Sequence, residues 1–143
     1  MSRRRGKSFL DTNIFVYTFD SSAPQKREKA RFLVAQALDD RMGVISYQVV
    51  QEFLNVATRK FARPLSVSDA LVYLDRVLMP LCEIFPEMSL YSRALATSAS
   101  AGLSFYDALI VSAAAVADCT VLLTEDLPDG RSIGGIEIRN PFL

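Results

Sequence analysis

Phe9-Leu10-Asp11-Thr12-Asn13 is a short apolar run that leads into a carboxylate, a hydroxyl and an amide. A segment with apolar periodicity, residues 14–19, follows at once. This order predicts a buried strand that delivers Asp11 to the start of a helix. In open α/β sheets, ligands bind at the carboxyl ends of the strands. Asp11 is therefore a candidate site residue, although an acid before a helix is also an ordinary N-cap.

The chain contains no histidine, which limits its chemistry. Histidine-based nucleophilic catalysis, imidazole zinc sites and histidine acid–base cleavage of RNA are all excluded. The two cysteines, Cys82 and Cys119, lie far apart and form no metal or redox motif. Carboxylates remain as the carriers of any chemistry, and oxygen ligands suit Mg²⁺ or Mn²⁺.

Length and composition are those of an ordinary globular protein. The 143 residues are 50% hydrophobic and 22% charged, which predicts one domain over 1–143 with its own core. No apolar run is long enough for a transmembrane helix, and the basic residues 3–7 lack the apolar segment of a signal peptide. Residues 1–7 are expected to form a basic, flexible extension. The low cysteine content favours a cytoplasmic protein.

Helical spacing alternates along the chain with short apolar runs. Helices are predicted after Pro24, over about 47–61, from 66 to about 79, over 87–100 and over 104–117. Strands are predicted over 8–10, 44–45, 83–85, 120–123 and 136–138. The alternation favours an α/β fold with three α/β/α layers around a central, mostly parallel sheet.

Local signals mark where these helices begin and end. Pro24 is expected in a first turn, Gly43 is expected to end that helix, and Ser46 is expected to cap the next one. The pairs Ser66-x-x-Asp69 and Ser104-x-x-Asp107 resemble capping boxes.

Four acids fall where this fold would gather them at one edge of the sheet. Asp11 ends the first strand, Glu52 lies at the edge of an apolar helical stripe, Asp107 is in a first helical turn, and Asp126 follows a buried strand. Each has a structural alternative: a cap, a solvated helix position, a capping box and a turn, respectively. Taken together, in a chain without histidine, they predict a metal-binding cluster.

The chain resembles the PIN-domain nucleases, in particular the VapC-like toxins of bacterial toxin–antitoxin pairs. The resemblance covers about residues 8–143. It is carried by Phe-Leu-Asp-Thr-Asn (9–13), Val-Val-Gln-Glu-Phe-Leu-Asn-Val (49–56), Ser-Phe-Tyr-Asp-Ala-Leu-Ile-Val (104–111), Leu-Leu-Thr-Glu-Asp-Leu-Pro-Asp-Gly (122–130) and Asn-Pro-Phe (140–142).

The resemblance implies which residues form the site. The acids of the family correspond to Asp11, Glu52 and Asp107, and the fourth position corresponds to Asp126. Asp129 is a substitute or partner for that fourth acid, and Glu125 is expected to point away. The side chains expected to orient the acids are Thr12, Asn13, Ser104 and Thr124.

It also implies an activity and partners. The expected reaction is Mg²⁺- or Mn²⁺-dependent hydrolysis of RNA that leaves 5′-phosphate and 3′-hydroxyl ends. A homodimer and a small cognate antitoxin are expected as well, without any membrane association. The sequence does not identify the RNA that is cleaved.

Two alternatives stay open at this point. One is a magnesium-dependent phosphatase of the haloacid-dehalogenase type with Asp11 as nucleophile. Such enzymes carry a second aspartate two residues later, where this chain has Asn13. The other is a non-catalytic nucleic-acid-binding module of the same fold.

Overall fold

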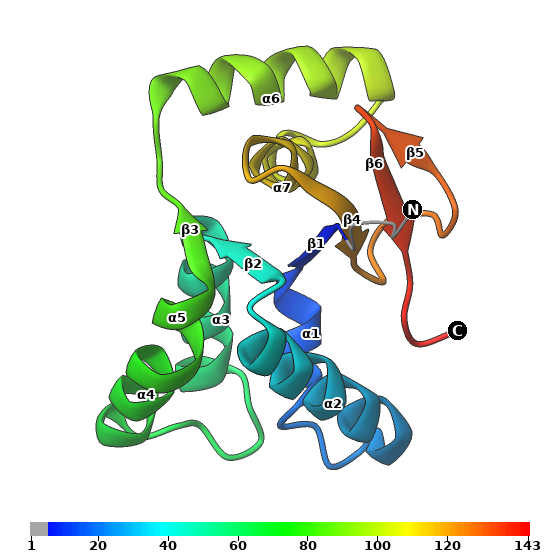
Figure 1. Ribbon diagram of the computed structural model, residues 1–143. Coiled ribbons are helices and arrows are strands. Elements are labelled where there is room, and N and C mark those ends of the chain that lie inside the picture. The colour runs from blue at the N-terminus through cyan, green and yellow to red at the C-terminus, as the bar shows by residue number, and fades with distance from the viewer. Residues whose placement is uncertain (1–5) are drawn as a thin grey trace.

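A computed structural model describes residues 6–143 of the protein (Figure 1). Within this range one sheet is formed by β1 (Lys7–Leu10), β2 (Gly43–Ser46), β3 (Cys82–Ile84), β4 (Cys119–Leu123), β5 (Ser132–Ile133) and β6 (Ile136–Arg139). The strand order is β3-β2-β1-β4-β6-β5, and only the β5–β6 pair is antiparallel. The predicted mostly parallel sheet is confirmed.

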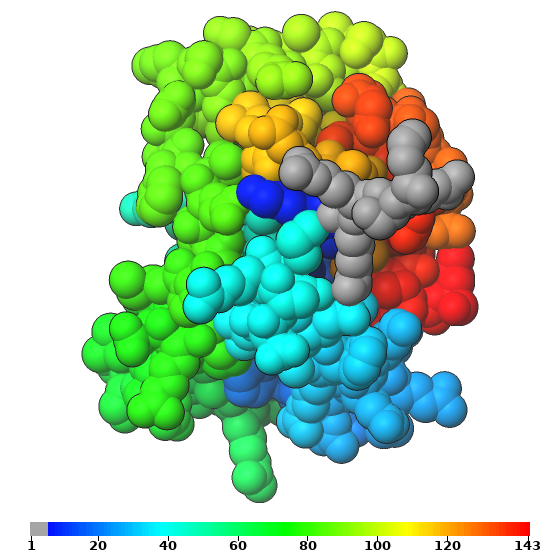
Figure 2. Space-filling model, in the orientation of Figure 1, coloured from blue at the N-terminus to red at the C-terminus, as the bar shows by residue number. Residues whose placement is uncertain are grey.

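Helices cover both faces of this sheet. They are α1 (Thr12–Tyr17), α2 (Pro24–Asp40), α3 (Tyr47–Arg59), α4 (Val67–Tyr73), the π-helical turn η1 (Leu74–Leu78), α5 (Met79–Leu81), α6 (Met88–Ala101) and α7 (Phe105–Val116). In Figure 1, α6 and α7 lie above the sheet, and α1, α2 and α3 gather below it. Figure 2 shows α7 between α6 and the first strand on this face of the molecule. The predicted three-layer arrangement is confirmed.

The core forms because each layer turns apolar side chains toward the sheet. Helix α7 is apolar on most sides and is buried from Ala108 to Ala114, between the sheet and α6. On the other face, the fully buried rings of Phe15 and Phe53 meet edge to face, with their centroids 6.3 Å apart, and join α1 to α3. These two packed layers hold the carboxyl ends of the strands in place.

Two of the three serine caps that the sequence predicts are present. The hydroxyls of Ser66 and Ser104 accept hydrogen bonds from the backbone N–H groups of Asp69 (3.1 Å) and Asp107 (3.2 Å). Ser46 occupies the N-cap position of α3, but its hydroxyl makes no capping hydrogen bond. The prediction for Ser46 was therefore wrong about the side chain.

Gly43 does not end helix α2, contrary to the prediction. Arg41 closes that helix in the left-handed region (φ 57°) and donates its backbone N–H to the carbonyl of Ala37. Gly43 instead opens β2, where a Cβ atom would lie 2.3 Å from the Cβ of Ala37. The glycine is required by this close approach of strand and helix.

Two further elements were not predicted. Strand β5 pairs with β6 through the tight turn Gly134-Gly135, in which both residues have positive φ. The single helix expected from residue 66 to about 79 is split by the π-helical turn η1. Pro80 follows that turn and supplies no backbone N–H, so the regular hydrogen-bond ladder cannot continue through it.

The ends of the chain differ in part from the prediction. Lys7 belongs to β1 and Gly6 precedes that strand, whereas residues 1–5 of the predicted basic extension lie outside the described residues. In the part of the chain that the structure describes, no single helix is long and apolar enough to span a bilayer. Helices α6 and α7 reach that threshold only as a pair, and they are bent by 115°.

The topology sets the position of the site. β1 pairs with β2 on one side and with β4 on the other, so the strand order reverses between β1 and β4. Leu10 and Leu123 are partners in the β1–β4 register, which places Asp11 and Thr124 side by side at the carboxyl edge. A reversal of this kind is the usual position of a ligand site in an open α/β sheet.

Candidate active site

Asp11 lies at the centre of the candidate site. It follows β1, serves as the N-cap of α1 and is 7% exposed. One carboxylate oxygen accepts a hydrogen bond from the backbone N–H of Thr12 at 2.7 Å. The other accepts one from the hydroxyl of Thr124 at 2.8 Å. The cap and the site residue are thus the same side chain, and the two interpretations of Asp11 are compatible.

Thr124 joins Asp11 to Asp126. Its side chain is fully buried, and its oxygen accepts hydrogen bonds from the Asn13 amide (3.2 Å) and from the backbone N–H of Asp126 (3.0 Å). The Asn13 amide also donates to the Asp126 carboxylate at 3.1 Å. Asp126 is exposed, but this network holds it beside the β1–β4 edge.

Glu52 reaches the same edge from helix α3. The hydroxyl of Thr12 donates to one of its carboxylate oxygens at 2.8 Å. The amide of Gln48, one turn earlier on α3, donates to the other at 2.7 Å. Glu52 is half-buried, and both of its oxygens are held by neighbouring donors, so the carboxylate is positioned rather than free in solvent.

The electrostatics of the site act chiefly on Asp11. The pKa of its carboxyl is raised to about 6, mainly by burial, and the nearby charges of Asp126 and Glu52 contribute to this rise. The hydrogen bonds from Thr12 and Thr124 oppose this rise but do not cancel it. Asp11 is therefore a buried acid beside two others, with no cationic side chain among the causes of its shift.

Asp107 is placed differently from the other three acids. Its backbone is fixed by the Ser104 cap in the first turn of α7, and its side chain is half-buried. Within the described residues, no hydrogen bond joins its carboxylate to Asp11, Glu52 or Asp126. The nearest link runs through the adjacent carbonyl of Tyr106, which accepts a 3.4 Å hydrogen bond from Gln48. Hydrogen bonds thus link three of the four predicted acids, and Asp107 is outside this network.

The two acids beside Asp126 in sequence lie elsewhere. The Asp129 carboxylate accepts a hydrogen bond from the backbone N–H of Asn140 at 2.8 Å, which ties the loop to the C-terminal segment. Glu125 accepts a hydrogen bond from the Tyr17 hydroxyl and pairs with Lys26 at 3.1 Å. Both acids therefore stabilise the loop around Asp126.

The chemistry of the donor set fits a small, hard cation. Within residues 6–143, no three acidic or cysteine side chains stand close enough together to enclose a metal ion in their present conformations. Asp11, Glu52 and Asp126 nevertheless offer oxygen donors at one edge, and the side-chain oxygen of Asn13 is buried beside them without a hydrogen-bond partner. Oxygen-only donors of this kind suit Mg²⁺ or Mn²⁺.

Sequence reasoning missed Gln48, which holds Glu52 from one turn away. Residues four apart lie on the same face of a helix, so the spacing of Gln48 and Glu52 within α3 was the available signal.

Comparisons with known proteins identify the family. The model of the PIN domain matches residues 8–127. Ribonuclease VapC7 of Mycobacterium tuberculosis is 32% identical over 127 residues, which cover 82% of this chain and 80% of that protein. The chain belongs to the PIN-domain family.

Solved structures agree on the fold. A toxin–antitoxin complex from Klebsiella pneumoniae aligns with a TM-score of 0.65 and 21% identity, over 94% of this chain and 98% of that one. DNA-bound VapBC from Salmonella typhimurium aligns with a TM-score of 0.63 and 21% identity, over 96% and 99%. Mycobacterium tuberculosis VapC20, a toxin that cleaves the sarcin–ricin loop, aligns with a TM-score of 0.54 and 16% identity, over 84% and 92%.

Proposed function

We propose that this protein is a metal-dependent endoribonuclease and the toxin of a toxin–antitoxin pair. The observation that supports this proposal most directly is the buried carboxylate of Asp11, which lies where the strand order reverses. Hydrogen bonds link it through Thr12 to Glu52 and through Thr124 to Asp126. Family membership and the 32% identity to Ribonuclease VapC7 support the same assignment.

The four acids Asp11, Glu52, Asp107 and Asp126 are proposed to hold Mg²⁺ or Mn²⁺. A bound divalent ion would neutralise phosphate charge and make water a better nucleophile. The chain supplies the orientation: Thr12 and Gln48 fix Glu52, and Thr124 fixes Asp11. Ser104 fixes the turn that carries Asp107.

The partners and setting are proposed on the same basis. RNA is the proposed substrate, because VapC7 is named a ribonuclease. A cognate antitoxin is proposed, because the aligned Klebsiella and Salmonella structures are toxin–antitoxin complexes. We further propose a cytoplasmic homodimer in which residues 1–143 form one nuclease domain.

A three-way assay tests this function. The purified protein is incubated with a structured RNA and with para-nitrophenyl phosphate, each with Mn²⁺ and with chelator. We expect Mn²⁺-dependent cleavage of the RNA only, because an ion held by the acids would act on the phosphodiester bonds of RNA. Turnover of the small phosphate ester alone would favour the phosphatase alternative. RNA binding without cleavage would favour the non-catalytic module.

The fourth acid can be assigned by comparing two substitutions of the same kind. Asp126→Asn should reduce Mn²⁺-dependent cleavage about 10- to 100-fold, because Asp126 shares the Thr124 network with Asp11. Asp129→Asn should change cleavage less than about threefold, because Asp129 binds the backbone of Asn140 instead. The measurement is the initial cleavage rate across a Mn²⁺ titration. A larger loss from Asp129→Asn would assign the fourth position to Asp129.

A further inference from the structure

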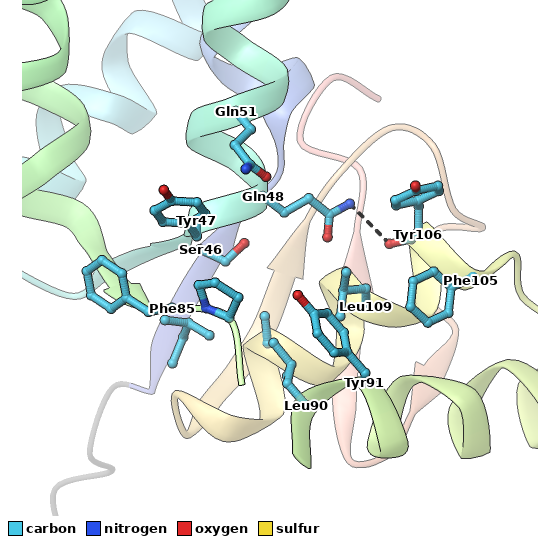
Figure 3. Close-up of a pocket in the computed structure, with 13 residues that line it drawn as sticks. Ser46, Tyr47, Gln48, Gln51, Phe85, Leu90, Tyr91, Phe105, Tyr106 and Leu109 are labelled. Atoms are coloured by element: carbon cyan, nitrogen blue, oxygen red, sulfur yellow. Dashed lines mark hydrogen bonds between the residues drawn. The ribbon is translucent and has the colours of Figure 1, made fainter. Parts of the chain in front are cut away.

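An aromatic groove lies beside the acidic edge. It runs between the start of α3, the end of β3 and the first turns of α6 and α7, and it has a volume of about 360 Å³. We call it the aromatic groove; its rings belong to Tyr47, Phe85, Tyr91, Phe105 and Tyr106. Figure 3 shows Phe85 and Tyr47 on one side, Phe105 and Tyr106 on the other, and Tyr91 rising from α6 between them.

Several of these rings are open to solvent. Phe85 is 57% exposed and Tyr106 is 67% exposed, although aromatic side chains are ordinarily among the most buried. Tyr47 and Phe85 lie 6.0 Å apart between ring centroids, and Phe105 and Tyr106 lie 5.6 Å apart. The groove thus has an aromatic pair on each side and remains accessible.

Polar atoms line the groove without partners. The hydroxyl of Ser46, a residue that is only 3% exposed, makes no hydrogen bond, and neither does the side-chain oxygen of Gln48. Buried polar atoms ordinarily have a partner, and leaving one unpaired costs stability. Both of these buried, unpaired oxygens belong to residues that line the groove, and this favours a ligand that carries hydrogen-bonding groups.

The groove is connected to the acids through a single side chain. The Gln48 amide donates to the carbonyl of Tyr106 at 3.4 Å (Figure 3). It also donates to Glu52 at 2.7 Å, and the side-chain oxygen of Gln48 has no hydrogen-bond partner. Tyr106 also immediately precedes Asp107. A ligand in the groove would therefore lie next to the reacting phosphate of an RNA held at the acidic edge.

We propose that the aromatic groove is a specificity pocket that receives one unstacked base of the RNA substrate, next to the cleaved bond. This inference rests on the proposed ribonuclease function. Bases taken out of a stack bind by stacking on aromatic rings and by hydrogen bonds along their edges. The paired rings supply the stacking surfaces. The side chains of Ser46 and Gln48 and the hydroxyl of Tyr91 supply the hydrogen-bonding groups. An apolar peptide side chain would fill the volume but leave the polar atoms unpaired.

The test couples a change in the RNA to a change in the groove. Cleavage of an oligonucleotide that contains the mapped cut site is compared with a series in which single bases near that site are removed. With the wild-type protein, one abasic position should lower kcat/KM about tenfold, the typical worth of one stacked base. With Phe85→Ala, the same abasic position should cost less than about twofold, because the stacking partner is already absent.

Phe32→Ala is the matched control. Phe32 is 59% exposed on α2 and does not line the groove, so the abasic penalty should remain as in wild type. If the protein cleaves RNA but Phe85→Ala changes no abasic penalty, the base-pocket proposal is wrong and the ribonuclease assignment still holds. Failure to cleave any RNA overturns both. A uniform loss from Phe85→Ala that accompanies a change of oligomeric state in sedimentation assigns the groove to a protein partner instead.

Ser46→Ala gives a second readout that does not require a large truncation. Removing a buried hydroxyl that has no partner should raise Tm by about 3 °C, since the hydroxyl costs stability and makes no cap. The same change should reduce the preference for the cognate base several-fold. A lower Tm together with unchanged base preference would show that Ser46 is purely structural.

Discussion

Replacing Asp11 with asparagine should lower the rate of divalent-dependent RNA cleavage more than about 100-fold. Loss of a group that merely orients a metal ligand typically costs 10- to 100-fold, and Asp11 is proposed to be a ligand itself. Asparagine keeps the size of the side chain and caps a helix about as well as aspartate, so the loss reports the missing charge. Asp107→Asn should cause a loss of similar size, although Asp107 is outside the hydrogen-bond network of the other three acids.

The measurement is single-turnover cleavage with identification of the product ends. Wild-type products should carry 5′-phosphate and 3′-hydroxyl groups, and chelator should abolish them, because water rather than the ribose hydroxyl attacks the phosphate. Asp39→Asn, an identical change at an exposed position at the end of α2, should leave the rate unchanged. Products with 2′,3′-cyclic phosphate, or cleavage that survives in chelator, would contradict the proposed mechanism.

Local signals explain why most of the elements could be predicted from the sequence. Helix α2 begins at Pro24, and helix α6 ends before Gly102, which is in the left-handed region. Both residues mark these helix ends through their own backbone conformation, which depends little on neighbouring residues. The capping hydroxyls of Ser66 and Ser104 reach only three residues along the chain. Such features are present in any short window of sequence.

The features that were missed depend on packing between distant segments. Gly43 is needed because helix α2 approaches strand β2 closely at Ala37. The sequence alone does not show that Ala37 is the residue that packs against this glycine. Strand β5 is only two residues long and exists because β6 offers it a partner. Neither the close approach of helix and strand nor the strand pairing can be predicted from local periodicity.

The candidate site also combines features set by local sequence with features set by contacts between distant segments. Asp11 could be predicted as a site residue because strand, acid and helix are contiguous, but its bond to Thr124 spans 113 residues and depends on the β1–β4 register. The choice between Asp126 and Asp129 could not be made from sequence, because both follow the same strand. The structure distinguishes them by their partners, Asn13 for the first and Asn140 for the second.

Asp11 should also be a source of instability in the metal-free protein. The pKa of its carboxyl is about 6, raised mainly by burial from the ordinary value of 3.8. Each pKa unit corresponds to about 1.4 kcal/mol, so the ionised side chain costs the folded state about 3 kcal/mol at neutral pH. Below about pH 4 the carboxyl is protonated in both the folded and the unfolded chain, and the cost is absent. The cost grows between about pH 4 and pH 6 and is complete above that range.

Asp11→Asn should therefore raise the free energy of unfolding at pH 7.5 by about 2 kcal/mol, or Tm by about 5 °C. The gain is smaller than the full cost, because an amide cannot accept both of the hydrogen bonds from Thr12 and Thr124 as the carboxylate does. At pH 4.5 the gain should be much smaller, because wild-type Asp11 is then largely protonated. If Asp11 were only a helix cap, asparagine would bring little change at either pH.

Divalent ions provide the decisive comparison in the same thermal melts. Mn²⁺ that binds only the folded protein should raise the wild-type Tm, because a concentration of 100 times Kd adds about 2.7 kcal/mol. The ion should shift Asp11→Asn far less, since that variant has lost a proposed ligand, and it should shift Asp39→Asn as much as wild type. Instability of the metal-free site and its affinity for the cation would then share one cause, the buried charge of Asp11 beside Glu52 and Asp126. If Mn²⁺ raised the Tm of wild type and of Asp11→Asn equally, the instability and the ion affinity would have different causes. Asp11 would then not be a metal ligand.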